Sequence, residues 1–265
     1  MNKVILVLSD ALRYDTAVAG MGYLGHLVDV KLASLYKVIG ELPSMSRPMY
    51  ETVHTGLTAS EHGIISNLVV RRSTKPNVFQ SARQAGKTTA AAAYYWFSEL
   101  YNRAPYDRIE DREVDDDSLL IQHGRFYTQD DYPDIELFAT AASLVRKFAP
   151  DYLLIHPMDM DYMGEKYGAN SSEYRNHAIR QDMWMSTLIA EWMERGYNIL
   201  VTGDHGMNAD RLPSRPTARR HHARCPRSSP VFDQTQYCRE GRLARSALPT
   251  PNRADNMQIA GCRYP

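Results

Sequence analysis

Short apolar runs recur along the chain at the positions expected for buried strands. Residues 4–8 are apolar at every position, which is typical of a parallel strand that helices cover on both faces. Similar runs predict further strands at 88–95, 152–156 and 198–202. None of these runs reaches the length of about 18 apolar residues that a membrane-spanning helix needs.

Between these runs, apolar residues recur at helical spacing, most clearly at 135–148 and 172–195. Strands alternating with helices of this length predict an α/β fold with a doubly wound, mostly parallel sheet and helices on both faces. In the second helix we expect one buried stripe, made of Ile179, Met183, Met185, Leu188, Ile189 and Trp192.

Two shorter segments carry expectations about their surroundings. Residues 110–117 contain six acidic side chains, which predicts a solvated acidic loop. Residues 94–97 are all aromatic, so they either border a substrate pocket or belong to the core. The spacing of residues does not distinguish these two alternatives.

The net charge of zero hides an uneven division of the chain. Residues 213–265 hold ten Arg, no Lys and three acids, a net charge of +7, whereas residues 1–212 carry −7. The last 53 residues also contain seven of the 14 prolines and all three cysteines. We therefore expect a core domain at 1–212 and an irregular Arg/Pro-rich tail at 213–265. The cysteine-free core, with no export signal at its start, predicts a cytoplasmic protein without a membrane partner.

Acidic and imidazole side chains follow three of the predicted strands. Asp10 follows the first strand, Asp159 and Asp161 follow the third, and Asp204 and His205 follow the last. Ligands bind at the carboxyl ends of strands in such sheets, and carboxylates crowded there repel one another unless divalent cations bind them. The alternative for Asp10 is a helix cap or turn residue.

Ser46 stands directly before a predicted helix, with Pro48 in its first turn. A hydroxyl at this place faces free backbone N–H groups and the positive end of the helix, which suits an anionic phosphoryl group. A metal held by Asp10, Asp204 and His205 could keep the Ser46 oxygen as an alkoxide nucleophile. The alternative is that Ser46 only caps the helix.

At these residues the chain resembles the alkaline phosphatase superfamily, and in particular its type I phosphodiesterase / nucleotide pyrophosphatase branch. The matching segments appear in the family's order: the strand ending in Asp10, Ser46-x-Pro48, Thr55-Gly56-Leu57, His62-Gly63-Ile64, residues 161–168 and residues 201–207. The resemblance spans roughly residues 3–210 and implies an alkaline phosphatase-like core.

The resemblance implies a two-metal centre, usually of zinc, that acts on phosphate esters. It assigns one metal to Asp10, Ser46, Asp204 and His205. It assigns the other to Asp161, to the fourth residue after it and to a histidine further downstream. Ser46 would attack phosphorus in line and form a phospho-enzyme, which water at the second metal would release.

The chain departs from the family pattern around the second metal. Glu165 stands where the family usually has histidine, and a carboxylate there keeps a site for zinc or manganese. Asp159 is a spare carboxylate that we rank below Asp161. His156 is either a ligand or, more simply, a packed residue beside the site. Arg47 is either a substrate-binding residue that pairs with a phosphate or a solvated side chain.

The tail lacks the downstream His-Gly pair and the closing strands of the family, so we expect an α/β core that is incomplete at its C-terminus. We hypothesise that the tail is translated out of frame from near Leu212. Codons compatible with Pro213-Ser214-Arg215, read one base later, can encode His-His-Gly. If the tail is native, His221 or His222 is the replacement ligand to consider.

The sequence thus predicts a metal-dependent hydrolase of small-molecule phosphate esters, with phosphodiesters or pyrophosphates favoured. A sulfatase is disfavoured because Tyr50, not Arg, stands four residues after Ser46. The alternative is an impaired or non-catalytic relative of the same fold. A nucleic-acid-binding role would depend on the Arg-rich tail, which contains no recognisable binding module.

Overall fold

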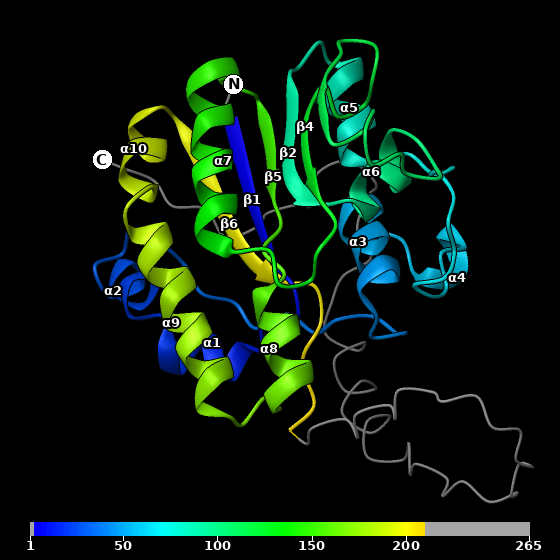
Figure 1. Ribbon diagram of the computed structural model, residues 1–265. Coiled ribbons are helices and arrows are strands. Elements are labelled where there is room, and N and C mark those ends of the chain that lie inside the picture. Colours follow the sequence, from blue (N-terminus) through cyan, green and yellow to red (C-terminus); the bar gives the residue numbers. More distant parts are fainter. Residues whose placement is uncertain (1–2, 210–265) are drawn as a thin grey trace, which may run out of the picture. The chain divides into compact units, whose positions relative to one another are not determined.

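The computed structural model describes residues 3–209, which form one six-stranded sheet with helices packed around it (Figure 1). In chain order the elements are β1 (Lys3–Ser9), α1 (Tyr14–Gly20), α2 (Gly22–Asp29), α3 (Ser46–Thr55), α4 (Ala59–His62), α5 (Val78–Gln84), β2 (Thr89–Tyr94), α6 (Trp96–Tyr101), β3 (Glu113–Asp115), β4 (His123–Tyr127), α7 (Asp134–Phe148), β5 (Tyr152–Ile155), α8 (Asp159–Tyr167), α9 (Ser172–Ser186), α10 (Ile189–Glu194) and β6 (Tyr197–Gly203).

The strands lie in the order β3-β4-β2-β5-β1-β6. The pairs from β4 to β6 are parallel, whereas β3 runs antiparallel to β4. The four strands expected from the apolar runs are therefore present, and the expected mostly parallel α/β sheet is confirmed. β1 lies between β5 and β6 and is parallel to both, so the residues that follow these three strands lie at the same edge of the sheet.

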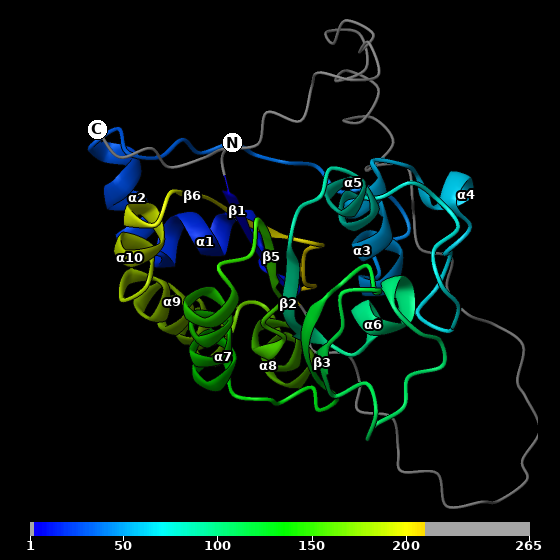
Figure 2. The ribbon, with the colours of Figure 1, turned by 90° about the horizontal axis from the view of Figure 1, so that it is seen from above.

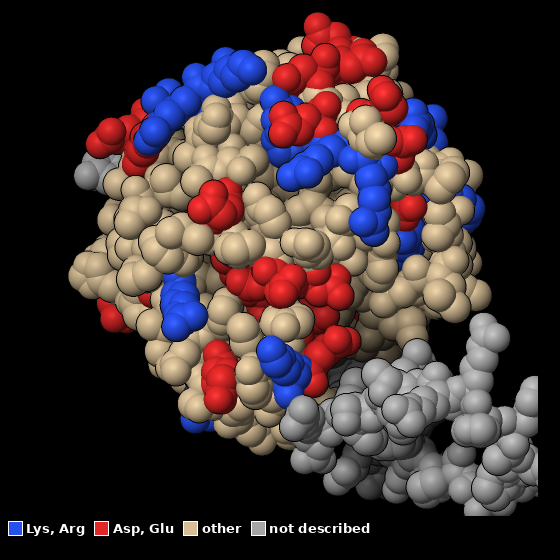
Figure 3. Space-filling model, in the orientation of Figure 1, with Lys and Arg blue, Asp and Glu red and all other residues tan. Residues whose placement is uncertain are grey.

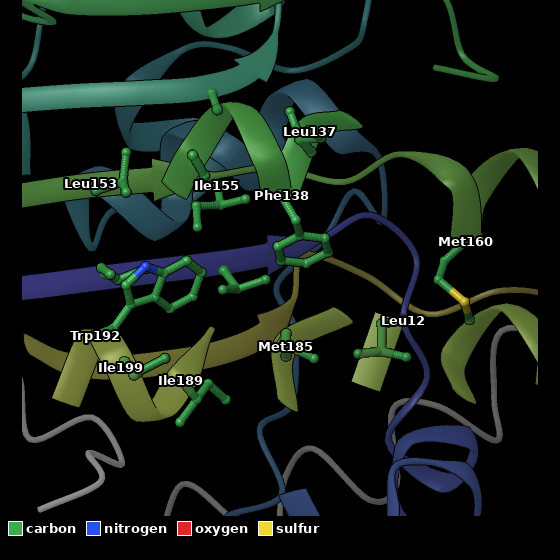
Figure 4. Close-up of a cluster of buried hydrophobic side chains, with 14 of the residues drawn as sticks. Leu12, Leu137, Phe138, Leu153, Ile155, Met160, Met185, Ile189, Trp192 and Ile199 are labelled. Atoms are coloured by element: carbon green, nitrogen blue, oxygen red, sulfur yellow. The ribbon is translucent and has the colours of Figure 1, made fainter. Parts of the chain in front are cut away.

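Alternate residues of each strand bury against different helices, which explains the continuous apolar runs. On β1, Ile5 and Val7 join a cluster with α7, α9 and α10, whereas Leu6 and Leu8 join a cluster with α3, α5 and α6. Figure 2 shows these two groups of helices on opposite sides of the sheet. The fully buried Trp192 belongs to the first cluster and packs among the aliphatic and aromatic side chains in Figure 4.

Local residues determine where several helices begin and end. The side chains of Asn77 and Ser171 accept hydrogen bonds from backbone N–H groups in the first turns of α5 and α9. Thr58 and Glu61 form a capping box at α4. Gly56 ends α3 in the left-handed conformation, with a φ of 70°, which explains the glycine at that place.

The helix expected at 172–195 is interrupted, because α9 ends at Ser186 and α10 begins at Ile189. The single buried stripe is therefore wrong in part: Ile179 and Met183 are 49% and 48% exposed, whereas Met185, Ile189 and Trp192 are buried. In α9 the buried face runs through Tyr174, Ala178, Gln181 and Met185, and Ile179 and Met183 lie four residues apart on another face.

The segment expected as a solvated acidic loop is in part a strand. Glu113–Asp115 is β3, the edge strand, and Asp111 is buried, so the expectation for 110–117 is corrected. Arg125 of β4 binds Asp115 with its Nη2 atom 2.9 Å from Oδ2. This ion pair between neighbouring strands stabilises β3, although acidic residues are uncommon in strands. Of the aromatic run 94–97, Tyr94 and Phe97 are core residues.

Some expectations concern residues outside 3–209. The domain boundary at 212/213, the frame hypothesis and the ligand role of His221 or His222 all lie beyond the described part of the chain and stay predictions. Within residues 3–209, no helix is both long and apolar enough to cross a membrane.

Candidate active site

Four side chains from three parts of the sequence meet at the carboxyl end of the sheet. The register of β1 and β6 pairs Ser9 with Gly203, which brings the next residues, Asp10 and Asp204, to the same level. His205 Nε2 lies 3.1 Å from Ser46 Oγ, 3.3 Å from Asp10 Oδ1 and 3.5 Å from Asp204 Oδ2. The predicted first ligand set is therefore brought together.

Backbone groups hold Asp204 and His205 in place. Asp204 Oδ1 accepts hydrogen bonds from the N–H groups of Ala11 (2.9 Å) and of His205 itself (2.8 Å). His205 Nδ1 lies 2.8 Å from the carbonyl oxygen of Gly206, to which it donates as a protonated Nδ1. When a cation replaces the proton on Nε2, this bond leaves Nε2, the atom that faces Ser46, as the ligand atom.

Gly203 permits the close approach that places Asp204. A Cβ atom on Gly203 would lie 2.5 Å from the carbonyl oxygen of Leu12, nearer than backbone atoms can approach. The glycine therefore lets β6 end against the turn that follows β1. The turn itself is held from α9, where the Tyr174 hydroxyl donates to Ala11 O and accepts from Arg13 N.

Asp10 is fully buried, and imidazole or hydroxyl groups lie close to both of its carboxylate oxygens. Its Oδ2 accepts a hydrogen bond from the Tyr50 hydroxyl and lies 3.3 Å from His156 Nε2. Burial by itself raises the pKa of Asp10, but the nearby imidazoles of His156 and His205 outweigh it and hold this pKa well below its usual range. Arg13 is the N-cap residue of α1, so Asp10 is no helix cap but lies in the turn after β1. His156 is fully buried, and its ligand role stays a prediction.

Ser46 is the first residue of α3, but its hydroxyl does not cap the helix. The preceding Met45 is the N-cap residue, and the Ser46 Oγ contact is with His205. The expectation of several free N–H groups around Ser46 needs correction. Pro48 has no N–H, and the N–H of Arg47 donates to Asn67 Oδ1 at 3.0 Å. Asn67, which the sequence reading missed, therefore anchors the start of α3.

Unbalanced charge surrounds these donor atoms. Burial alone would lower the pKa of His205, but the charges of Asp204 and Asp10 raise it to about 10. Burial and the charge of Asp10 raise the pKa of Asp204 to about 7. Both shifts have the same cause, because acidic groups lie close together in a buried place and favour a bound positive charge.

The donor set fits a metal ion. Asp10 Oδ1 and Asp204 Oδ2 are buried atoms without a hydrogen-bond partner in the described part of the chain. Two carboxylates, an imidazole and a hydroxyl are ligands that zinc accepts in tetrahedral geometry, at bonds of about 2.0–2.2 Å, so that the ligand atoms lie about 3.3–3.6 Å apart. The distances of 3.1–3.5 Å around His205 Nε2 are close to this spacing.

Asp161 and Glu165, one turn apart on α8, lie near this set but are not part of it. Asp10, Asp204 and His205 form a group whose ligand atoms lie within 4.8 Å of one another, and neither Asp161 nor Glu165 belongs to that group. Burial, together with the charges of Asp10 and Glu165, raises the pKa of Asp161 to about 8. The second ligand set stays a prediction.

Arg47 does not have the surroundings that we expected. It is 1% exposed, so the solvated alternative is wrong. Its Nη2 atom lies 2.7 Å from Glu99 Oε2, and its guanidinium carbon lies 4.4 Å from the centre of the Trp96 ring. The charge of Arg47 is therefore already paired inside the protein, which removes the basis for a phosphate contact.

The spare carboxylate Asp159 points elsewhere. Its Oδ2 lies 2.9 Å from His177 Nε2, in a second cluster that also contains Asp134. This supports the ranking of Asp159 below Asp161 as a ligand of the Ser46 centre.

A family comparison decides what this arrangement belongs to. The family model for type I phosphodiesterase / nucleotide pyrophosphatase matches residues 4–215, which is most of the chain. The chain belongs to this family. The resemblance expected from the motifs is thereby confirmed. Among curated proteins, this family member is similar to GPI ethanolamine phosphate transferase 2 of Debaryomyces hansenii, with 22% identity over 222 residues. The alignment covers 78% of this chain and 24% of the transferase.

Solved structures support the fold. An inactive variant of murine ectonucleotide pyrophosphatase / phosphodiesterase 5, in complex with AMP, matches with a TM-score of 0.60 and 17% identity, over 78% of this chain and 58% of that one. Phosphonoacetate hydrolase from Sinorhizobium meliloti 1021, in complex with phosphonoformate, matches with a TM-score of 0.54 and 22% identity, over 77% and 57%. This family member thus spans less than two thirds of each relative.

Proposed function

We propose that the protein hydrolyses phosphate esters, with phosphodiesters or pyrophosphates as substrates, through a covalent phosphoryl group on Ser46. The observation that carries this proposal is the convergence of Ser46 Oγ with His205 Nε2 and with two buried carboxylate oxygens that have no hydrogen-bond partner among residues 3–209. Family membership supports the same reaction class. A substrate with a phosphate flanked by two ester or anhydride bonds also fits the nucleotide pyrophosphatase relatives.

In this proposal Asp10, Ser46, Asp204 and His205 hold one divalent cation, most simply zinc, with manganese as the alternative. Asp161 and Glu165 hold a second. When bound, the cations supply positive charge that favours the ionised serine oxygen and neutralises charge on the phosphoryl group. The second set lacks a third protein ligand among residues 3–209, so it is the weaker of the two.

The chain's own residues position the nucleophile. Arg47 N–H and Asn67 fix the start of α3, and Ser46 Oγ is thereby held 3.1 Å from His205 Nε2. Ser46 Oγ attacks phosphorus, a new O–P bond forms, and the bond from phosphorus to the leaving oxygen breaks. A water molecule then attacks the same phosphorus and releases Ser46. Asn67 Oδ1 accepts from Arg47 N–H, and in this proposal its side-chain NH₂ donates to an oxygen of the phosphoryl group.

Replacement of the nucleophile tests this function. In Ser46→Ala, turnover of bis(p-nitrophenyl) phosphate should fall by at least about 10³-fold, while bound metal and melting temperature change little. Ser44→Ala is the matched control, because Ser44 is an exposed serine two residues earlier. Quenched reactions of the wild type with ³²P-labelled diester should yield labelled protein, and Ser46→Ala should yield none.

The main alternative is a relative that has lost activity. A wild type that binds metal and melts cooperatively, but releases no p-nitrophenol above the Ser46→Ala rate, would establish that alternative. Turnover that is equal in the wild type and in Ser46→Ala would instead exclude the serine mechanism. The cytoplasmic location expected from cysteine usage stays a prediction.

A further inference from the structure

A second cluster of ligand-type side chains lies apart from the Ser46 centre, among three helices. Asp134 and Asp159 are the first residues of α7 and α8, and His177 belongs to α9. All three are buried, and one ligand atom from each lies within 4.8 Å of the others. Figure 1 shows these three helices next to one another on one face of the sheet.

The hydrogen bonds inside the cluster leave a carboxylate oxygen unused. Asp159 Oδ2 accepts from His177 Nε2 at 2.9 Å and from the N–H of Asp134 at 3.3 Å. Asp134 Oδ2 accepts from Gln181 Nε2 at 2.7 Å. Asp134 Oδ1 is buried and has no hydrogen-bond partner within residues 3–209, although the residue is only 4% exposed. A buried carboxylate oxygen left in this state carries a large desolvation cost.

The charges of the cluster are also unbalanced. Burial and the charge of Asp159 raise the pKa of Asp134 to about 7. Arg180 lies at the exposed rim, and among the described residues it forms an ion pair with neither acid. His177 is bonded to Asp159, and no ion pair of Asp134 is present among residues 3–209.

The cluster is accessible from the surface. A pocket of about 250 Å³ is lined by Asp134, Asp159 and His177 together with Arg180 and Trp184. This volume admits a hydrated ion. Figure 3 shows acidic side chains gathered at the centre of the same face, which raises the local concentration of cations.

We propose that Asp134, Asp159 and His177 bind one divalent cation at a site separate from the Ser46 centre. Two carboxylates and an imidazole suit zinc or manganese, with water completing the coordination. The cation joins the starts of α7 and α8 to α9. It also connects to the catalytic edge, because Gln181 bridges Asp134 to Ser9, whose hydroxyl donates to Gln181 Oε1 at 2.7 Å. This site does not depend on the proposed hydrolytic function.

Metal counting on the full chain tests the site. Equilibrium dialysis against Mn²⁺ should give one bound equivalent fewer in Asp134→Asn than in the wild type, and the same loss in His177→Gln. Asp134→Asn keeps an oxygen that can accept from Gln181 Nε2, and His177→Gln keeps an N–H that can donate to Asp159. Asp131→Asn is the matched control, since Asp131 is an exposed acid three residues earlier, and it should bind as the wild type does.

Equal Mn²⁺ binding by the wild type and by Asp134→Asn would overturn the proposal, because a proton alone would then neutralise Asp134. An equal loss in Asp131→Asn would also overturn it, since the acidic surface rather than the cluster would bind the ion. If circular dichroism shows that Asp134→Asn is unfolded, the number of Mn²⁺ ions bound by His177→Gln tests the proposal instead. Asp204→Asn should lose a different equivalent, so that Asp204→Asn combined with Asp134→Asn loses both.

Discussion

Arg47 and Glu99 form a buried ion pair directly behind the nucleophile, and Arg47→Met removes one of its partners. The Nη2–Oε2 distance is 2.7 Å, and the two side chains are 1% and 6% exposed. The change leaves the Glu99 carboxylate buried without a counter-charge. Breaking such a pair costs about 3–5 kcal/mol, so the free energy of unfolding should fall by that amount.

Arg47→Met/Glu99→Gln separates charge from packing. The glutamine oxygen can still accept the Tyr106 N–H that Glu99 Oε1 accepts at 3.2 Å, but no charge is buried. The double variant should therefore be more stable than Arg47→Met, with a coupling free energy of about 2–3 kcal/mol. Urea unfolding followed by tryptophan fluorescence measures these differences, provided that the m-values agree.

Two results would refute this reasoning. A loss below about 1 kcal/mol in Arg47→Met would mean that the pair does not stabilise the start of α3. A double variant that regains stability but shows a many-fold higher KM for the diester would mean that Arg47 contacts substrate after all. We expect KM to stay close to that of the wild type.

Three further predictions follow from the surroundings of single residues. Burial lowers the pKa of His54 to about 4 from 6.5, so the unfolded state binds more protons between these values. The free energy of unfolding should thus fall by about 3 kcal/mol from pH 6.5 to pH 4. In His54→Phe this fall should be smaller by that amount, and an unchanged pH profile would contradict the assignment. Gly203→Ala should cost about 1–3 kcal/mol in urea unfolding because of the clash with Leu12 O, whereas Gly22→Ala, in open space, should cost little; equal costs would be inconsistent with the clash. Chelation with EDTA should lower the melting temperature and abolish turnover, and added Zn²⁺ should restore both; a protein indifferent to EDTA would exclude the metal centre.

The periodic segments were predictable because their burial pattern follows directly from local geometry. A strand buried on both faces requires an uninterrupted apolar run, and residues 4–8 satisfy this on β1. The edge strand β3 could not be found this way, since its acidic residues depend on pairing with Arg125 of β4. The break between α9 and α10 has the same origin, because the packing of Trp192 and Ile189 against the sheet outweighs a continuous helical pattern.

The first ligand set was predictable for a similar reason. Carboxyl ends of parallel strands meet at one edge, so Asp10, Asp204 and His205 could be expected together from their places after strands. The partners of buried charged side chains were not predictable in this way. Arg47 next to Ser46 suggested a phosphate contact, but the distant Glu99 and Trp96 hold its charge inside the protein.

The sequence by itself therefore determined the family, the parallel sheet and the residues delivered to its carboxyl edge, because each follows from motifs and short-range periodicity. Tertiary structure decided what lies between elements that are far apart in the chain. It set the Asn67 contact that anchors α3 and the pairing of Arg47 with Glu99. It also set the meeting of Asp134, Asp159 and His177 from three helices. Such contacts depend on packing angles and registers between elements, which no local spacing encodes.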